Sequence, residues 1–407
     1  MNMRVNTSLN SRGMIAVLIA QFISALADNA LLFAAIALLK SHAAPGWQTP
    51  LLQEFFVAAF ILLAPFVGQF ADFLPKGRVM LMANGVKFLG AMAMLTGLHP
   101  LLAYGLVGIG AAAYSPAKYG ILSELVGVHK LVKANSLMEG STIVAILLGA
   151  IVGGWLAGVS VNMALAVIAG CYLLAAGANL LIPILAPAQP LAYFSFPILT
   201  RDFIHALRTL LGNTDARFSL IGTSVFWGAG GTLRFLLVAW VPVALMISDD
   251  AKALSTAANL SGAVAIGIAI GAIAAARYVS LNSINRALPA GIMIGALIIT
   301  FAFVDNLYMA ILVLIVIGAC GGFYIVPLNA LLQERGRASV GSGHAIAVQN
   351  FFENFCMLLM IGFYVALDKQ GISVTHSTIA VGALVLMAIS TLVWQRNCVK
   401  KYSNENH

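Results

Sequence analysis

The sequence predicts an all-α integral membrane protein with twelve transmembrane helices in two six-helix bundles. Three observations lead to this prediction. Of the 407 residues, 61% are hydrophobic and only 9% are charged, whereas soluble proteins average about 25% charged residues. Apolar runs long enough to cross a bilayer recur along the whole chain. A single long break near the middle of the chain separates two equal groups of such runs.

The first half contains six apolar runs. The first run follows Arg4 and Arg12, as in a secretory signal, but it continues to Leu39 and more runs follow, so we expect a transmembrane helix. The breaks at 98–101 and 158–161 are short, and pattern alone leaves ten or eleven helices open. The expected spans of this half are 14–40, 51–73, 79–98, 101–123, 136–158 and 161–184.

The second half repeats this arrangement after a linker at 185–216. The linker carries Pro187, Pro190 and Pro197, followed by a short amphipathic stretch at 201–211. We therefore expect an N-terminal bundle over 1–184, a cytoplasmic linker over 185–216, and a C-terminal bundle with a short tail over 217–407. The expected spans of the second half are 217–246, 254–278, 286–303, 307–333, 344–367 and 373–395.

The distribution of Lys and Arg predicts that both termini are cytoplasmic, because cytoplasmic loops of membrane proteins are enriched in these residues. With the N-terminus inside, sixteen Lys and Arg residues fall on the cytoplasmic side, and only Lys40, Lys252 and Lys369 fall on the other. The net charge of +8 therefore reports topology and gives no reason to expect nucleic-acid binding.

Two charged side chains stand alone in apolar spans at matching places in the two halves. Asp28 is the only ionisable residue of 14–39, and Arg234 is the only one of 222–243. Asp28 lies roughly 20 Å into its helix, where a charge costs from about 3 to over 10 kcal/mol. We expect both to face one central, water-accessible cavity. The alternative is a permanent Asp28–Arg234 ion pair that only orients the helices.

The segment from Gly68 to Arg78 resembles the loop signature of the major facilitator superfamily, in which an acid is followed by Gly and basic residues. Asp72, Lys76 and Arg78 occupy those places, with two extra residues between the acid and the Gly. The resemblance implies that these side chains contact neighbouring helix ends and latch the bundles together on the cytoplasmic side. An ordinary positively charged loop is the alternative.

Four further segments are more specific: FISALADNALLF (22–33), YSPAKYGILSEL (114–125), GTSVFWGAGGTLRFLL (222–237) and VPLNALLQERG (326–336). Together they are similar to the bacterial lysophospholipid transporters, and the likeness extends along the whole chain. The resemblance implies that the protein moves lysophospholipids, chiefly lysophosphatidylethanolamine, from the outer to the inner leaflet of the Gram-negative inner membrane by alternating access. It also implies a partner acyltransferase with acyl-carrier-protein synthetase activity.

The residues fit such a cargo. Arg234 offers a fork of donors for phosphate oxygens, and Asp28 can take the ammonium, or hold Arg234 when no substrate is bound. Lys118 is either a substrate group, as a second phosphate contact or a relay toward the cytoplasm, or a lysine whose amine reaches the nearby interface. The expected substrate-binding residues are Asp28, Asn29, Arg234, Lys118 and Tyr119.

Further charged residues are expected in a gating network. Glu139 and Glu353 either pair with Lys118, Lys87 or Arg337, or stabilise the helix starts at which they lie. Lys87 joins the network or makes a buried contact between helices. The expected set is Asp72, Lys76, Arg78, Lys87, Glu139, Glu353 and Arg337.

Other classes of function fit less well. No nucleophile elbow, P-loop, metal-binding pair or histidine with an aspartate five residues later appears, so we expect no enzyme, cofactor or metal site. A proton-coupled transporter of a soluble metabolite or drug, with Asp28 as proton carrier, is the alternative function. The expected partners are a lysophospholipid substrate, membrane lipid and the acyltransferase, around a monomer in the bacterial inner membrane.

Overall fold

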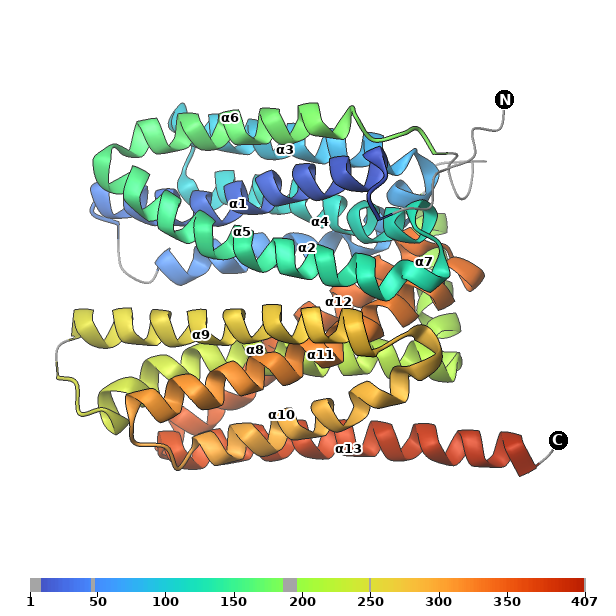
Figure 1. The fold of residues 1–407 in the computed structure, drawn as a ribbon. Coiled ribbons are helices and arrows are strands. Elements are labelled where there is room, and N and C mark those ends of the chain that lie inside the picture. Colours follow the sequence, from blue (N-terminus) through green and yellow to red (C-terminus); the bar gives the residue numbers. More distant parts are fainter. Residues whose placement is uncertain (1–8, 45–47, 186–195, 249, 406–407) are drawn as a thin grey trace. The chain divides into compact units, whose positions relative to one another are not determined.

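The computed structural model describes residues 9–44, 48–185, 196–248 and 250–405, and its regular secondary structure is helical (Figure 1). Two short 3₁₀ helices, η1 (Val128–Lys130) and η2 (Leu281–Ala287), precede α5 and α10. The α-helices of the described residues are α1 (Arg12–Ser41), α2 (Gln48–Phe73), α3 (Lys76–Leu95), α4 (Pro100–Leu125), α5 (Leu131–Val159), α6 (Val161–Asn179), α7 (Phe196–Gly212), α8 (Thr214–Ala244), α9 (Asp250–Tyr278), α10 (Leu288–Phe301), α11 (Leu307–Ser339), α12 (Ser342–Lys369) and α13 (Val374–Glu405).

The two shortest predicted breaks are helix ends with local causes. Between α3 and α4, Gly97 has φ 101°, a left-handed conformation that glycine adopts without steric cost. The imidazole of His99 then accepts a hydrogen bond from the backbone N–H of Leu101 and caps α4. Between α5 and α6, the Ser160 hydroxyl accepts from the N–H of Met163. Serine in extended conformation is a favoured N-cap residue, so α5 and α6 are separate helices.

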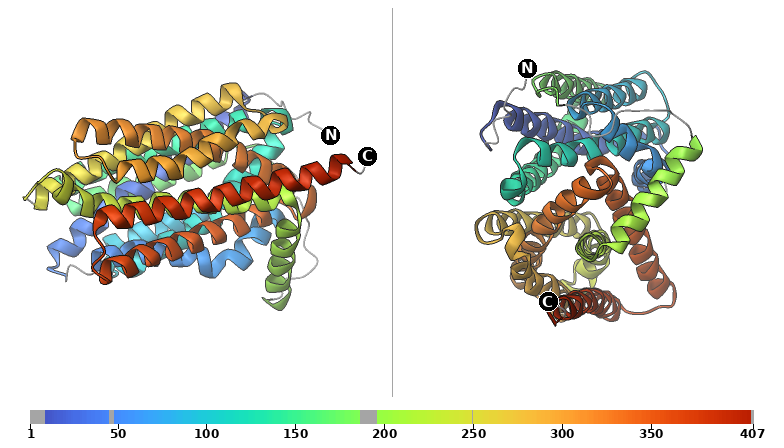
Figure 2. Two further views of the ribbon diagram at one scale, coloured as in Figure 1. Left: turned by 90° about the horizontal axis from the view of Figure 1, so that it is seen from below. Right: turned by 90° about the vertical axis from the view of Figure 1, so that its right-hand side faces the viewer.

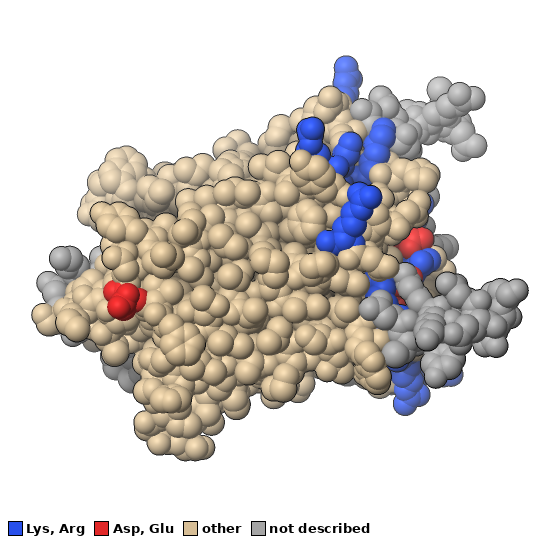
Figure 3. Space-filling model, turned by 60° about the horizontal axis from the view of Figure 1, so that its bottom comes forward, with Lys and Arg blue, Asp and Glu red and all other residues tan. Residues whose placement is uncertain are grey.

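Eleven helices of the described chain are long and apolar enough to cross a membrane, which confirms a multi-span membrane protein. The remaining two are α4 and α7. Helix α4 has 26 residues, enough to span. Its glycine, alanine and tyrosine residues, together with Pro116 and Lys118, lower its mean hydropathy. On the face seen in Figure 3, the middle of the surface carries no charged side chain.

The chain divides into two compact units. The first comprises Met1–Ala134, Ser141–Leu210 and Gln333–Phe351, and the second comprises Asn135–Gly140, Leu211–Leu332 and Phe352–His407. Each unit therefore takes in a short segment from the other half of the chain. The division of the sequence at 184 and 217 stays a prediction, since the units follow contacts and do not follow chain order.

In the first unit, α4 packs between α2 and α3, and α6 packs against α1 and α3. Alanines let α1 approach its neighbours closely, since Ala27, Ala30 and Ala34 are fully buried. Gly149 and Gly153 of α5 face the backbone of α1 near Ala30. Small residues at helix contacts are typical of membrane proteins, in which close van der Waals packing stabilises helix association.

In the second unit, α13 packs against α8 and α10, and α8 packs against α9. The closest approach is between α9 and α11, where two pairs of glycines spaced four apart meet. Gly267 and Gly271 lie against the α11 backbone, and Gly318 and Gly322 lie against the α9 backbone. This confirms that these glycines serve helix packing.

The linker region holds one helix, α7. Residues 186–195 lie outside the described part of the chain, so the expectations for Pro187 and Pro190 cannot be followed there. Figure 2 shows α7 running transverse to the long helices of the first unit. Phe203 is buried and packs edge-to-face on Phe351, with ring centroids 5.8 Å apart.

Candidate substrate cavity in the first unit

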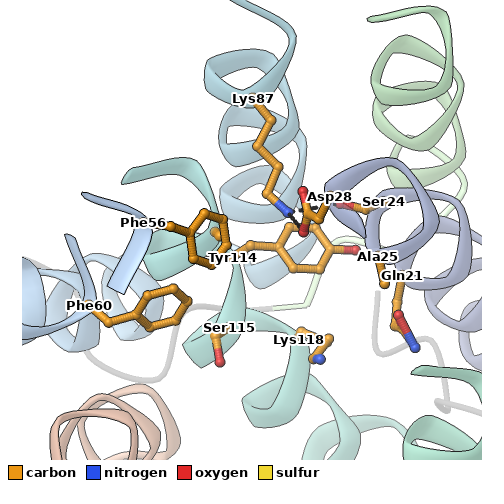
Figure 4. Close-up of a pocket in the computed structure, with 11 residues that line it drawn as sticks. Gln21, Ser24, Ala25, Asp28, Phe56, Phe60, Lys87, Tyr114, Ser115 and Lys118 are labelled. Atoms are coloured by element: carbon orange, nitrogen blue, oxygen red, sulfur yellow. Dashed lines mark hydrogen bonds and ion pairs between the residues drawn. The ribbon is translucent and has the colours of Figure 1, made fainter. Parts of the chain in front are cut away.

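A cavity of about 150 Å³ lies among α1, α2, α3 and α4 in the first unit (Figure 4). Helix α1 contributes Gln21, Ser24, Ala25 and Asp28, which are spaced three, four and seven residues apart. This spacing places them on one helical face. The residues from the other three helices are Phe56, Phe60, Lys87, Ala111, Tyr114, Ser115 and Lys118.

Two donors contact the carboxylate of Asp28, one at each oxygen. The Lys87 ammonium lies 2.6 Å from Oδ2, and the Tyr172 hydroxyl donates to Oδ1 at 2.8 Å. The Lys87 side chain is 2% exposed and that of Asp28 is 19% exposed. Both side chains line the cavity, and the carboxylate is the more exposed member of the pair.

Neighbouring polar groups complete the coordination of Lys87. Its ammonium also donates to the Ser24 hydroxyl at 3.0 Å, and that hydroxyl donates to Oδ1 of Asn84 at 2.7 Å. The ammonium lies 4.9 Å from the centre of the Tyr114 ring, close enough for a cation–π interaction. A buried ion pair is tolerated when further hydrogen bonds compensate for lost hydration, and this shell supplies them.

The cavity has a polar wall and an aromatic wall. Asp28, Lys87 and Lys118 lie on α1, α3 and α4, and Phe56 and Phe60 lie opposite on α2 (Figure 4). The two phenylalanine rings are 5.7 Å apart, and Phe56 also packs on Tyr104 at 5.2 Å. The cavity therefore offers charged contacts on one side and apolar contacts on the other.

Lys87 and Tyr172 contact both oxygens of the Asp28 carboxylate, and a pairing of Asp28 with Arg234 stays a prediction. Arg234 lies on α8 in the second unit. Its side chain is exposed and makes no hydrogen bond or ion pair among the described residues. A role for Arg234 in phosphate binding stays a prediction.

The other predicted substrate residues differ in position. Lys118 lines the cavity, and its ammonium lies 4.2 Å from the centre of the Tyr119 ring. Tyr119 thus contacts Lys118 and is not part of the lining. Asn29 is also outside the lining: its amide donates to the Ala25 carbonyl one turn earlier at 2.8 Å, and its Cβ lies beside Gly149 of α5. Asn29 directly follows Asp28, so its side chain leaves the helix about 100° further around the axis.

Asp72 is the centre of a second buried cluster in the first unit. Its carboxylate accepts from the backbone N–H of Gly343 at 2.7 Å and of His344 at 3.0 Å, in the first turn of α12. The His344 ring nitrogen Nδ1 lies 3.0 Å from the same carboxylate. A carboxylate at a helix N-terminus satisfies free backbone donors and complements the helix dipole.

Lys76 extends this cluster to α4. Its ammonium lies 3.3 Å from Asp72 and 2.7 Å from Glu124, and its side chain is 1% exposed. Nearby, the Arg337 guanidinium donates to the carbonyl of Ser123. The α2–α3 turn, the end of α4 and the 333–351 segment are thus joined by charged groups; Arg78, in contrast, is exposed.

The two predicted glutamates of the gating network lie in the second unit. Glu139 is buried and accepts from the amide of Asn329 at 3.3 Å. Glu353 is the twelfth residue of α12, in its fourth turn, within the part of that helix assigned to the second unit. Their pairing with Lys118, Lys87 or Arg337 stays a prediction.

The sequence analysis did not predict several residues of the Asp28 cavity and of the Asp72 cluster. Gln21 and Ser24 carried a usable signal, because they recur with Asp28 on one helical face of an apolar span. Tyr172 carried none, since a single phenol in a span is most often a packing residue. His344 and Glu124 lie outside the recognised loop segment, so only the three-dimensional structure places them beside Asp72 and Lys76.

Comparison with known proteins agrees with this architecture. The family profile of the Major Facilitator Superfamily matches residues 17–361. Among solved structures, the human organic anion transporter MFSD10 (TETRAN) superposes with TM-score 0.74 at 15% identity, covering 94% of this chain and 99% of that one. The Escherichia coli fucose:proton symporter FucP (N162A) gives TM-score 0.70 at 14% identity, covering 94% and 98%. These structures show the fold alone.

Closer relatives share much more sequence. The lysophospholipid transporter LplT of Escherichia coli O7:K1 (strain IAI39 / ExPEC) is 55% identical over 396 residues, covering 97% of this chain and 99% of the relative. LplT of Shigella boydii serotype 4 (strain Sb227) gives the same identity and coverage. The chain therefore belongs to the major facilitator superfamily and, within it, to the lysophospholipid transporter family.

Proposed function

We propose that this protein moves lysophospholipids between the two leaflets of a membrane by alternating access. The observation that carries the proposal is 55% identity over nearly the whole chain to lysophospholipid transporters, in a protein whose cavity has one charged wall and one aromatic wall. A lysophospholipid has a phosphate, often an ammonium, and a single acyl chain. The two walls match these two kinds of group.

The head group is the part that fits the cavity. Pockets that enclose whole drug-sized ligands measure roughly 300–1,000 Å³, whereas this one holds about 150 Å³. We assign the ammonium to Asp28 and the phosphate to Lys118 within the first unit. Arg234 of the second unit is a further hydrogen-bond donor to the phosphate. The acyl chain follows the side of Phe56 and Phe60, toward the surrounding lipid.

The cellular setting is also part of the proposal. Both termini are cytoplasmic, the two chain halves form the two moving bundles, and the protein works as a monomer in the inner membrane of a Gram-negative bacterium. Cargo moves from the outer to the inner leaflet, where an acyltransferase re-acylates it. The clusters around Asp72 and Lys76 hold the cytoplasmic ends together in one phase of the cycle.

Uptake of labelled lysophosphatidylethanolamine into spheroplasts or proteoliposomes tests the function. Asp28→Asn should abolish most uptake, and Lys369→Gln, an exposed residue at the end of α12, should leave it intact. Glycerophosphoethanolamine, which has the same head without a tail, should compete poorly. Strong competition by this soluble compound, combined with collapse of uptake in a protonophore, would instead favour a proton-coupled carrier of soluble metabolites.

A further inference from the structure

Helix α7 has two opposite faces of different chemistry. Leu199, Phe203, Ala206 and Leu210 are at most 7% exposed, and the Phe203 ring packs on Phe351 of the same unit. The opposite side presents Arg201, His205 and Arg208, here termed the cationic face, and all three residues are exposed. Their spacing of four and three residues places them in one row along the helix.

The cationic face borders open space. A hollow of about 700 Å³ is lined by Arg201, His205 and Arg208 together with Pro197, Thr200 and Ile204. None of the three cationic-face residues makes a hydrogen bond or ion pair within the described chain. Asp202 is the only acid of α7, and it lies about 100° around the helix from Arg201. The charge of the two arginines is therefore not neutralised within α7.

Apolar side chains flank the cationic face. Ile198 and Ile204 are each 42% exposed, and they lie on either side of the row of Arg201, His205 and Arg208. Exposed isoleucines beside arginines are unfavourable toward bulk water but suit a bilayer interface, where apolar groups reach the acyl region and guanidinium groups reach phosphates. The transverse course of α7 (Figure 2) matches the in-plane course of an interfacial helix.

We propose that the cationic face of α7 is a binding site for the phosphate head groups of anionic phospholipids in the cytoplasmic leaflet. Arg201 and Arg208 are seven residues apart and about 10 Å along the axis, which suits two adjacent head groups. The site is separate from the Asp28 cavity. The site takes resident bilayer lipid and is not proposed to take the transported lysolipid, so it stands or falls independently of the transport proposal.

The test uses the full chain in nanodiscs of phosphatidylcholine, with and without phosphatidylglycerol. Native mass spectrometry counts the phosphatidylglycerol molecules retained after mild extraction. The double variant R201Q/R208Q should retain less, by about fivefold for each arginine removed, and added salt should weaken retention by the wild type. The control K40Q/K369Q removes two exposed charges at the C-terminal ends of α1 and α12. It should retain as much phosphatidylglycerol as the wild type.

Equal retention by R201Q/R208Q and wild type would overturn the site. Equal retention of phosphatidylcholine and phosphatidylglycerol, or stabilisation of the protein by inorganic phosphate without lipid, would also overturn it. So would selective binding of an acidic soluble protein to this face with no effect of lipid charge. Both arginines are exposed, so folding should survive their loss. The single variants R201Q and R208Q, checked by thermal unfolding in phosphatidylcholine nanodiscs, keep the test valid if the double variant is unstable.

Discussion

At the scale of single residues, the decisive feature is the ion pair between Asp28 and Lys87. A carboxylate inside a membrane helix needs a compensating charge, and Lys87 supplies it from α3 at 2.6 Å. A buried pair of this kind adds little net stability, but removing one member leaves an uncompensated charge and is strongly destabilising. Lys87 is therefore essential to the fold of the cavity as well as to its electrostatics.

Replacing Lys87 with methionine should lower the free energy of unfolding in detergent micelles by about 3 kcal/mol, the low end of the range for a broken buried pair. The low end applies because Asp28 is 19% exposed and can draw on water in the cavity. The double variant D28N/K87M should recover most of this loss without recovering uptake. Equal stability of K87M and wild type would show that the pair is not structural.

The Tyr172 hydroxyl holds the second carboxylate oxygen of Asp28. Tyr172→Phe should cost about 1.5–3 kcal/mol, the typical contribution of a hydrogen bond to a charged group, and should raise the KM for lysolipid because Asp28 loses its fixed orientation. Tyr104→Phe is the matched control, since Tyr104 is equally buried and makes no hydrogen bond within the described chain. A similar loss in both variants would attribute the effect to packing.

At the scale of elements, helix ends and glycine seams decide which helices can meet. The C-terminal end of α2 meets the first turn of α12 through Asp72, which accepts two backbone N–H groups there. The approach is close enough that a side chain at Gly341 or Gly343 would collide with the Asp72 carboxylate. Glycine at these positions is therefore a requirement of the cluster.

Asp72→Asn tests this helix junction. Asparagine can still accept a hydrogen bond but removes the charge that neutralises Lys76, leaving only Glu124 at 2.7 Å. We expect a loss of about 1–3 kcal/mol of stability together with a large loss of uptake. Asp305→Asn, at an exposed site in the α10–α11 turn, is the control and should have no effect on either measurement.

The close contact between α9 and α11 through their glycines can be tested by protein stability alone, without a ligand. A Cβ at Gly271 would meet the backbone of α11 at Ala319, whereas a Cβ at Gly154 of α5 would meet nothing within 4 Å. Gly271→Ala should therefore destabilise the protein by about 1–3 kcal/mol through overpacking. Gly154→Ala should be neutral or stabilising, because alanine favours helix. The free energy of unfolding of both variants, measured in micelles, tests this prediction. Equal stability of the two variants would contradict the close contact between α9 and α11.

At the scale of the whole molecule, the pattern of charges predicts topology. On the face seen in Figure 3, Lys and Arg gather toward one end of the surface, as expected when positively charged loops stay on the cytoplasmic side. Lys40 and Lys369 close α1 and α12 at their C-terminal ends. Both should therefore face outward if the N-terminus is inside.

Single cysteines placed at these sites check the orientation. In a background without Cys171, Cys320, Cys356 and Cys398, a membrane-impermeant maleimide should label Lys40→Cys and Lys369→Cys on intact spheroplasts. It should label Arg208→Cys only after the membrane is opened. Labelling of Arg208→Cys on intact spheroplasts would reverse the proposed orientation.

The sequence predicted the helices well because their signal is local. Apolar length fixes each span, and capping residues such as Ser160 fix its end. The partners in the cavity were not predictable in the same way. Asp28 and Lys87 are 59 residues apart, and their meeting depends on how α3 is rotated between α4 and α6, which no local pattern records. Tyr172 was missed for the same reason.

The small volume of the cavity has a consequence for the range of cargo. A cavity of about 150 Å³ can contact the polar head group but is too small to enclose the acyl chain attached to it. Lysolipids with saturated or unsaturated tails, and with fourteen or eighteen carbons, should then be carried at similar rates. Such indifference would suit a bacterium that remodels its fatty acids with growth temperature, because one carrier would serve every membrane composition that the cell makes.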